Sequence, residues 1–212
     1  TTNFGSAIDT FVVQSYGYSV LVQHDGKILL GGGSNGSFVL ARYNSSGSLD
    51  TTFDTDGKVA TRLSGEGFSA AIQSDGKILL AGMAYANTNT ANNFALARYH
   101  SNGSLDSTFG TDGKVTTDFG GHSQGRSVVV QSDGKILVVG TDETNGTPNF
   151  DIARYNSNGS LDTTFDIDGK VTTAFGGFDT GSTITVQADG KLLVGGIAFF
   201  NGDYVFAMAR YD

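Results

Sequence analysis

A set of short motifs that recurs four times along the 212 residues constrains the fold more than any other feature. The triplet Ala-Arg-Tyr occurs in every copy, and its arginines are spaced by 56 residues. The motif Gln-x-Asp-Gly-Lys also occurs four times, and Leu-Asp-x-Thr-Phe occurs three times. The copies fill the chain, so the sequence predicts a single domain over residues 1–212. Its repeat units fall at about 15–63, 64–119, 120–175, and 176–212 plus 1–14.

Within one unit the apolar residues follow the period of β-strands. The run Ser127–Gln131 is followed by an Asp-Gly turn and a second apolar run, Lys135–Gly140. Asp-Gly between two such runs indicates a hairpin, because the turn needs a positive φ that glycine adopts without strain. Two further strands are predicted at Phe150–Tyr155 and Lys170–Phe175. Helix signals are nearly absent, which makes the chain all-β.

Four short antiparallel strands in a unit of about 53 residues are typical of a β-propeller blade. Both faces of the third strand are largely apolar, as a sheet between two neighbouring blades requires: Phe94 and Leu96 alternate with Ala95 and Ala97. We take the first strand of each unit as the inner one, because its small residues suit a crowded axis. A parallel β-helix ranks below this interpretation, since its coils are shorter and need no Asp-Gly hairpins.

The fourth unit runs out at Asp212, after its third strand. We therefore expect the N-terminal segment Ile8–Val13 to supply the missing outer strand, which removes the free edge of the last blade. The same segment can complete the blade of its own chain or that of a neighbouring chain. Head-to-tail donation that does not close a ring gives a filament.

The charge of the chain argues against nucleic acid as a partner. Thirteen Lys and Arg residues stand against 21 Asp and Glu residues, and 11 of the 13 cations belong to Asp-Gly-Lys or Ala-Arg-Tyr triplets. A phosphate-binding surface needs many free cations. The absence of cysteine excludes disulfides, thiolate metal sites and a cysteine nucleophile. No apolar run approaches the roughly 20 residues of a membrane span, and the start at Thr1 predicts a trimmed product or a fragment.

Several linked motifs in this chain resemble one known family. They are Gly-Ser-Leu-Asp-x-Thr-Phe, Asp-Gly-Lys-Val, Val-Gln-Ser-Asp-Gly-Lys-Ile-Leu and Phe-x-Leu-Ala-Arg-Tyr-Asn. Together they are similar to the delta-60 repeat, a bacterial β-propeller repeat that is distantly similar to the NHL type of blade. The resemblance covers essentially the whole chain. It implies an exported or cell-surface bacterial protein, and it supplies no catalytic residues.

The arginines of Ala-Arg-Tyr lie on the apolar face of their strands, so we expect them to be buried. A buried guanidinium needs a partner. An aspartate follows eight residues after each of the first three arginines, which predicts structural ion pairs, with a ring of ligand-binding arginines as the alternative. The predicted pairs are Arg42 with Asp50, Arg98 with Asp106, and Arg154 with Asp162.

Two turns, at residues 54–57 and 166–169, begin like a calcium loop with the pattern Asp-x-Asp-Gly. The later ligands are missing, because a lysine follows in both copies, and the third copy has Gly110 in place of the first aspartate. We therefore expect turn chemistry and no cofactor, with calcium as the alternative. The three histidines fall at non-equivalent places in their units and predict neither a metal centre nor a catalytic triad.

The loops divide into two sets, one alike in every unit and one variable in length and content. We expect the two sets on opposite sides of the propeller. A scaffold keeps its repeated turns and varies its binding loops, so the aromatic residues of the variable side are candidates for a binding surface; alternatively, they cap the cores of the blades. These residues are Tyr16, Tyr18, Phe68, Tyr85, Phe178, Phe199, Phe200 and Tyr204.

These observations favour a non-catalytic, exported β-propeller that acts as a structural or interaction module at the bacterial cell surface and associates with itself. The alternative is a lectin-like module that binds a glycan, or a surface protein, with the variable loops. A third hypothesis is an enzyme with a metal on the propeller axis. The inner strands offer serines for that role but no ring of histidines or acids.

Overall fold

A computed structural model describes residues 14–86, 91–144 and 146–212 of the chain. These residues form four antiparallel sheets, and within each sheet neighbouring strands follow chain order. The first sheet contains β1 (Ser15–Val22), β2 (Ile28–Ser34), β3 (Ser37–Tyr43) and β4 (Lys58–Arg62); the second β5 (Gly65–Ile72), β6 (Ile78–Tyr85), β7 (Asn92–Tyr99) and β8 (Lys114–Thr117); the third β9 (His122–Val130), β10 (Ile136–Thr144), β11 (Thr147–Tyr155) and β12 (Lys170–Thr173); and the fourth β13 (Thr180–Val186), β14 (Leu192–Phe200) and β15 (Asp203–Tyr211).

The first two strands of each sheet are joined by a tight hairpin turn at the Asp-Gly pair of the repeated motif. In the first sheet Gly26 has a φ of 80°, and the amide of Gln23 donates to the carbonyl of Lys27 at 2.8 Å. A side chain would be strained at this φ, which explains why the turn carries glycine in all four units. The equivalent glycines are Gly76, Gly134 and Gly190, with φ of 81°, 86° and 87°.

The first strand of each sheet also carries a β-bulge, where the register with the second strand shifts by one residue. The second strand has a glycine opposite the bulge because there is no room for a side chain. A Cβ at Gly32 would lie 1.8 Å from the carbonyl oxygen of Tyr16, and one at Gly140 would lie 1.8 Å from that of Gln124. The residues at the bulges are Tyr18, Phe68, Arg126 and Ser182.

Three hydrophobic cores lie between consecutive sheets. In the first core, Phe38 of the first sheet packs with Ile78 and Leu80 of the second. The alternation predicted for the third strand is confirmed, since Ala95 belongs to this core whereas Phe94 belongs to the next. Each inner sheet therefore buries both of its faces, one against the preceding sheet and one against the following sheet.

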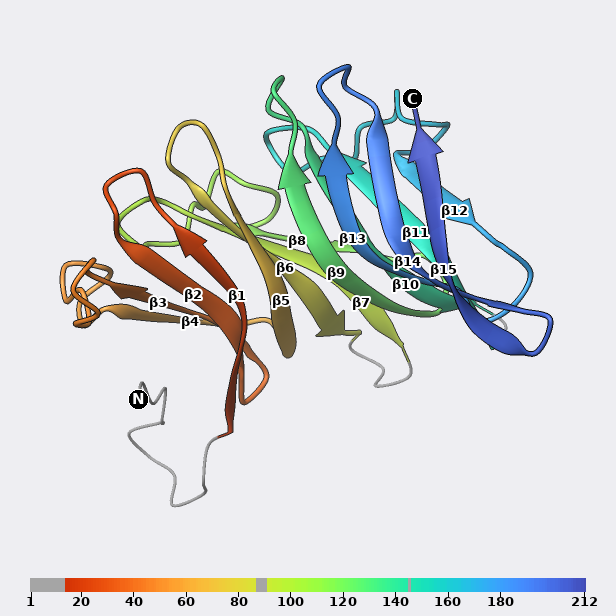
Figure 1. Ribbon diagram of the computed structural model, residues 1–212. Helices are drawn as coiled ribbons and strands as arrows, with labels where there is room; N and C mark the ends of the chain where they lie inside the picture. Colours follow the sequence, from red (N-terminus) through yellow and green to blue (C-terminus); the bar gives the residue numbers. More distant parts are fainter. Residues whose placement is uncertain (1–13, 87–90, 145) are drawn as a thin grey trace.

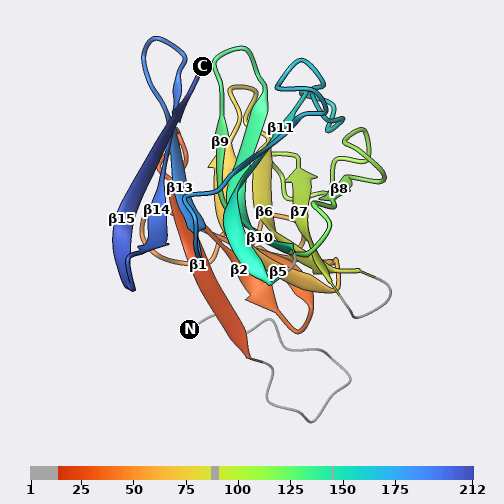
Figure 2. The ribbon, with the colours of Figure 1, turned by 90° about the vertical axis from the view of Figure 1, so that its right-hand side faces the viewer.

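The sheets are the blades of a β-propeller. The inner strands follow one another around a common axis: β1 contacts β5, β5 contacts β9, and β9 contacts β13. Figure 1 shows the four blades side by side along an arc, with the sheet of β1 at one end and the sheet of β15 at the other. Figure 2 views the same arc from the side of the fourth blade. The predicted fold class, an all-β propeller with four antiparallel blades, is confirmed.

The two ends of the arc differ from its interior. Among the described residues, β13 and β1 do not share the extensive contact that joins the other neighbouring inner strands. The fourth blade has three strands there, and β15 has no strand on its outer side in the part of the chain that the structure describes. The segment Ile8–Val13, predicted to occupy this edge, lies outside the described residues.

Candidate functional site

Each of the first three blades holds a buried or nearly buried arginine near the end of its third strand. The Nε atom of each arginine donates to the carboxylate of the aspartate eight residues downstream. The distances are 2.7 Å from Arg42 to Asp50, 2.8 Å from Arg98 to Asp106, and 2.7 Å from Arg154 to Asp162.

The motif Leu-Asp-x-Thr-Phe builds the rest of this arrangement. In the first blade, the Cζ atom of Arg42 lies 4.5 Å from the ring centroid of Phe53, a cation–π contact. The hydroxyl of Thr52 donates to Asp50 at 2.7 Å. The second and third blades repeat the arginine–ring contact at 4.4 Å with Phe109 and Phe165. The threonine, aspartate and phenylalanine of the motif are thus explained by packing around one guanidinium.

A lysine joins every one of these pairs, and sequence reasoning missed it. Lys27 Nζ lies 3.0 Å from the Asp50 carboxylate. The equivalent distances are 3.2 Å for Lys77 and 2.6 Å for Lys135. The sequence contains a sign of this role, because a lysine follows the hairpin Asp-Gly in all four units. Each aspartate therefore forms ion pairs with two cations.

The surroundings favour the ionised form of these aspartates. The hydrogen bond from Thr52, with those from Lys27 and Arg42, holds the pKa of Asp50 well below its usual range, although burial opposes this. For Asp106, burial acts to raise the pKa, but hydrogen bonds from Thr108 and Lys77 outweigh it and lower the pKa. Carboxylates held in this state do not serve as general acids at neutral pH.

Two of the arginines also tie their blade to the next one. Arg42 Nη1 donates to the carbonyl of Ser101 in the second blade at 2.5 Å, and Arg98 Nη1 donates to the carbonyl of Ser157 in the third. One nitrogen of each guanidinium donates to the next blade, and a phenylalanine ring covers the guanidinium, so these arginines link neighbouring blades inside the protein. Arg210, the equivalent residue of the fourth blade, is exposed.

The face of the fourth blade that points away from the third is apolar and open. Phe206 of β15 is 98% exposed, whereas the equivalent residues Phe38, Phe94 and Phe150 are 0%, 1% and 0% exposed. In the first three blades this face is covered by the following blade. We call the open surface the blade-4 face; it consists of Ile197, Phe199, Tyr204, Phe206 and Met208.

The inner strand of the first blade is open in the opposite direction. Val20 of β1 is 65% exposed, whereas Val128 of β9 and Ile184 of β13, at the equivalent position, are each 7% exposed. In the later blades this position packs against the preceding blade. The two ends of the arc thus present opposite halves of the same kind of interface.

A hollow of about 360 Å³ lies on the propeller axis. All four inner strands contribute to it, mainly through the residues at their bulges. Apolar rings come from β1 and β5, and polar side chains come from β9 and β13. Its lining residues are Tyr18, Phe68, Gln124, Arg126 and Ser182. Sequence reasoning missed Arg126 and Gln124, whose role depends on a bulge that a single sequence does not display.

Two of the predicted aromatic residues, Tyr18 and Phe68, line this hollow, and Tyr16 lies beside Tyr18; none of the three is in a variable loop. Tyr16 and Tyr18 belong to β1, and Phe68 belongs to β5. Their rings are in contact, at 6.0 Å between Tyr16 and Tyr18 and 5.3 Å between Tyr18 and Phe68. The prediction of a loop position was wrong, because the glycine next to each aromatic residue marks a bulge within a continuous strand.

The other five aromatic residues are dispersed. Phe199 and Tyr204 form an edge-on pair at 5.1 Å on the blade-4 face. Phe200 lies at the end of β14, Tyr85 at the end of β6, and Phe178 between β12 and β13, and all three are exposed. The structure therefore separates the predicted surface into an axial group, a blade-4 group and single residues.

The Asp-x-Asp-Gly segments form turns. Asp56 Oδ1 accepts a hydrogen bond from the amide of Lys58 at 3.0 Å, and its other oxygen lies 3.3 Å from Lys58 Nζ. Asp168 and Lys170 repeat the arrangement. In the described part of the chain, no three His, Asp or Glu side chains are grouped so that they could hold a metal ion. No described helix is long and apolar enough to cross a membrane.

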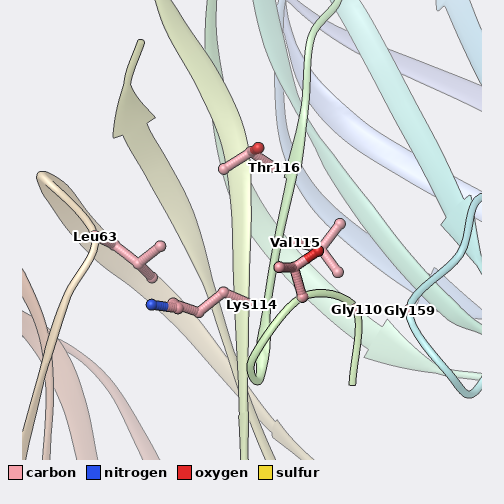
Figure 3. A pocket seen from close by; sticks show the side chains of 7 residues that line it. Leu63, Gly110, Lys114, Val115, Thr116 and Gly159 are labelled. Carbon is pink, nitrogen blue, oxygen red and sulfur yellow. The ribbon is translucent and has the colours of Figure 1, made fainter. Parts of the chain in front are cut away.

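A second hollow, of about 420 Å³, opens on the outer side of the second blade. Figure 3 shows Leu63 and Lys114 at its wall, beside Val115 and Thr116 of β8. The remaining lining is loop backbone around Gly110. With a single charged side chain and no aromatic ring, this hollow offers less recognition chemistry than the axial one.

The third blade contains a buried pair of acids that sequence reasoning also missed. Asp151 Oδ2 accepts a hydrogen bond from the amide of Asp142 at 2.9 Å, and Asp142 accepts one from Ser123 at 2.7 Å. Burial, helped by the nearby Asp142 charge and opposed by hydrogen bonds from Thr172 and the Asp142 amide, raises the pKa of Asp151 to about 7. The equivalent positions carry Val39, Ala95 and Ala207, so the pair is particular to this blade.

A known protein family matches all four repeat units. A family described as a domain of unknown function (DUF5122) β-propeller matches residues 23–53, 73–109, 131–165 and 187–212, more than half of the chain. The chain belongs to the DUF5122 β-propeller family. Each matched segment runs from the hairpin glutamine through the arginine of Ala-Arg-Tyr, so in the first three blades the family pattern coincides with the arginine–aspartate–lysine ties. Among curated proteins, no significant sequence relative was found.

Solved structures resemble the DUF5122 propeller in fold. An endo-1,4-β-xylanase from Bacteroides thetaiotaomicron matches with a TM-score of 0.50 and 11% identity, over 90% of this chain and 74% of the other. A fucose lectin from Kordia zhangzhouensis in complex with methyl-fucoside gives a TM-score of 0.40 and 15% identity, over 68% of this chain and 91% of the other. At these identities the likeness concerns the fold alone.

Proposed function

We propose that the DUF5122 propeller is a non-catalytic structural module of the bacterial cell surface that associates with further copies of itself. The observation that supports this proposal is the blade-4 face. Phe206 is 98% exposed, although its three equivalents are essentially buried by the following blade. A contiguous apolar patch of this kind is typical of a protein–protein interface.

In the proposed contact, the first blade of one chain covers the blade-4 face of another. The occupant matches because Val20 and Val22 of β1, at 65% and 70% exposure, belong to the inner strand that a preceding blade covers elsewhere in the arc. The segment Ile8–Val13 is predicted to add to the outer edge of β15, of the same chain or of the neighbour. Repetition of this head-to-tail contact closes a ring or extends a filament.

Mass photometry and negative-stain electron microscopy of the purified protein test the association. The wild type should form oligomers or filaments, and Phe206→Asp and Met208→Asp should shift them to monomers, because a buried carboxylate in an apolar contact is costly. Phe178→Ser is the matched control, since Phe178 is exposed but lies outside the blade-4 face. A wild type that is monomeric at all concentrations would contradict the proposal.

We also propose that the protein is exported, because its motifs resemble the delta-60 repeat. Fractionation of the source cells, with an antibody against the protein, would detect it at the surface or in the medium. The non-catalytic role draws support from the axial hollow, whose described lining contains neither histidine nor carboxylate. Xylan hydrolysis by the purified protein would contradict that role, and xylan is a suitable substrate because a xylanase shares the fold.

Carbohydrate binding is the second function that we propose. The observation in its favour is the pair Tyr18 and Phe68 in the lining of the axial hollow, with Tyr16 stacked on Tyr18, since grouped aromatic rings offer flat apolar faces to a sugar ring. A glycan array should show binding by the wild type that is lost in Tyr18→Ala. The triple variant Phe199→Ala, Phe200→Ala and Tyr204→Ala separates the axial group from the blade-4 group, and it should bind as the wild type does.

A further inference from the structure

The four axial positions differ in chemistry although they share one backbone. Each bulge residue lies between a glycine and a hydroxyl residue, in the sequences Gly-Tyr-Ser, Gly-Phe-Ser, Gly-Arg-Ser and Gly-Ser-Thr. Bulges often redirect a side chain toward a functional site. Here they direct four different side chains to one hollow, namely Tyr18, Phe68, Arg126 and Ser182.

The residues that flank the bulge have structural roles. The hydroxyl of Ser19 accepts a hydrogen bond from the amide of Ala70 in the next blade at 3.0 Å. Ser69 does the same for the amide of Val128 at 3.2 Å. These serines join consecutive inner strands, which explains why a hydroxyl residue recurs there. The bulge residue that precedes each serine makes no such bond. The packing of the blades therefore does not determine which amino acid stands at the bulge.

Arg126 is unusual among the cations of this chain. Arg126 and Arg62 are the only two that belong to neither an Asp-Gly-Lys nor an Ala-Arg-Tyr triplet. Arg126 is exposed, and among the described residues it forms no salt bridge; its one hydrogen bond runs from Nη2 to Gln124 Oε1 at 3.3 Å. This guanidinium, which pairs with no carboxylate of the described residues, is available to an anion although the chain has a net charge of −8.

The neighbours of Arg126 define the rest of the ligand. Tyr18 and Phe68 lie edge-on at 5.3 Å and present apolar ring surface to the hollow. Gln124, and Ser182 on β13, supply an amide and a hydroxyl at the same lining. Such a set matches a sugar ring with an apolar C–H face, several hydroxyl groups and one carboxylate.

We propose that the axial hollow binds an acidic sugar, a uronic acid residue at a chain end or within an oligosaccharide. Its carboxylate pairs with the Arg126 guanidinium, and its pyranose ring packs on Tyr18 and Phe68. Gln124 and Ser182 hydrogen-bond the hydroxyl groups. This inference rests on the second proposed function, carbohydrate binding, and adds the class of sugar and the residue that selects it.

Isothermal titration calorimetry with three probes tests the inference: a trigalacturonate, the same trisaccharide as its methyl ester, and neutral xylotriose. The wild type should bind the free acid about tenfold or more tightly than the ester, because only the acid forms the charge-assisted pair. Arg126→Gln should remove that preference and bind acid and ester alike. Arg62→Gln is the matched control, because Arg62 lies on the outer strand β4 and does not line the hollow.

The outcomes separate the inference from the function on which it rests. Equal affinity of the wild type for acid and ester would overturn the acidic-sugar assignment while carbohydrate binding stands. An unchanged preference in Arg126→Gln would overturn the role of the arginine. No binding of any of the three probes would overturn both. Circular dichroism of Arg126→Gln should match the wild type, because the side chain is exposed.

Discussion

The interfaces within the arc and the surfaces at its ends are built from equivalent residues, but only the former are covered. Leu40, Leu96 and Ile152 are 0–1% exposed, and Met208, at the same place in the fourth blade, is 69% exposed. The repeat makes each blade with two apolar faces, whatever its position in the chain. The exposure at the ends is therefore a consequence of repetition, and it shows which surfaces are suited to a further blade.

The largest expected contrast concerns the same phenylalanine in two blades. Phe94→Ala removes a fully buried ring from the core between the second and third blades and should lower the free energy of unfolding by about 3–5 kcal/mol. Phe206→Ala, measured on dilute monomer, should change it by less than about 0.5 kcal/mol. Urea denaturation followed by tyrosine fluorescence measures both. Equal losses would show that the blade-4 face is covered in the monomer.

A second contrast concerns the ion pairs. Asp106→Asn leaves Arg98 and Lys77 without their buried carboxylate and should cost about 3 kcal/mol at pH 7. Because the pKa of Asp106 is lower in the folded state, its contribution is present above about pH 4 and is lost as the pH falls further. Asp212→Asn breaks the exposed contact with Lys191 and should have little effect. Urea midpoints between pH 2 and 7 test this, and a wild type whose acid sensitivity equals that of Asp106→Asn would contradict it.

The third blade allows a test in another pH range. The pKa of Asp151 is raised to about 7 in the folded state, so the folded protein holds a proton that the unfolded chain releases near pH 4. Its contribution to stability is full below pH 4 and declines up to about pH 7, by about 1.4 kcal/mol per pH unit at most. Asp151→Asn should remove this decline. Thermal melts at pH 4.5 and 8 measure it, and an identical pH dependence in the variant would refute the assignment.

The smallest contrast concerns the hydroxyl groups beside the bulges. Ser69→Ala removes the acceptor for the amide of Val128 and should cost about 1 kcal/mol. Thr183, the equivalent residue of the fourth blade, is exposed at the end of the arc. Thr183→Ala should therefore leave the urea midpoint unchanged. If both variants lost the same stability, an inter-blade bond would not be the reason for the recurring hydroxyl.

The sequence allowed the blades to be predicted because each repeated motif has a local cause. Asp-Gly specifies the hairpin through a positive φ, and a buried arginine such as Arg98 must have a carboxylate such as Asp106 nearby. The lysine partner was missed because it reaches the aspartate across the sheet, from a hairpin about 30 residues away in the chain. Such proximity follows from strand pairing and not from spacing.

The axial site was only partly predictable for a similar reason. Tyr18 and Phe68 were singled out as candidates, but glycines beside them suggested loops where the structure continues the strand through a bulge. A bulge is defined by the register between two strands, which one sequence does not state. Arg126 was missed, because its place on the axis follows from the fold and not from the sequence.

The arginine ties have a direction, and this bears on how the molecule comes apart. Arg42 reaches forward to the carbonyl of Ser101, and Arg98 reaches forward to that of Ser157. Arg154 makes no such forward bond in the part of the chain that the structure describes, so the fourth blade is held to the third without this tie. Unfolding should therefore begin at the C-terminal blade and spread to the preceding blades one after another. Amide hydrogens of β14 and β15 should exchange with solvent long before those of β6 and β10.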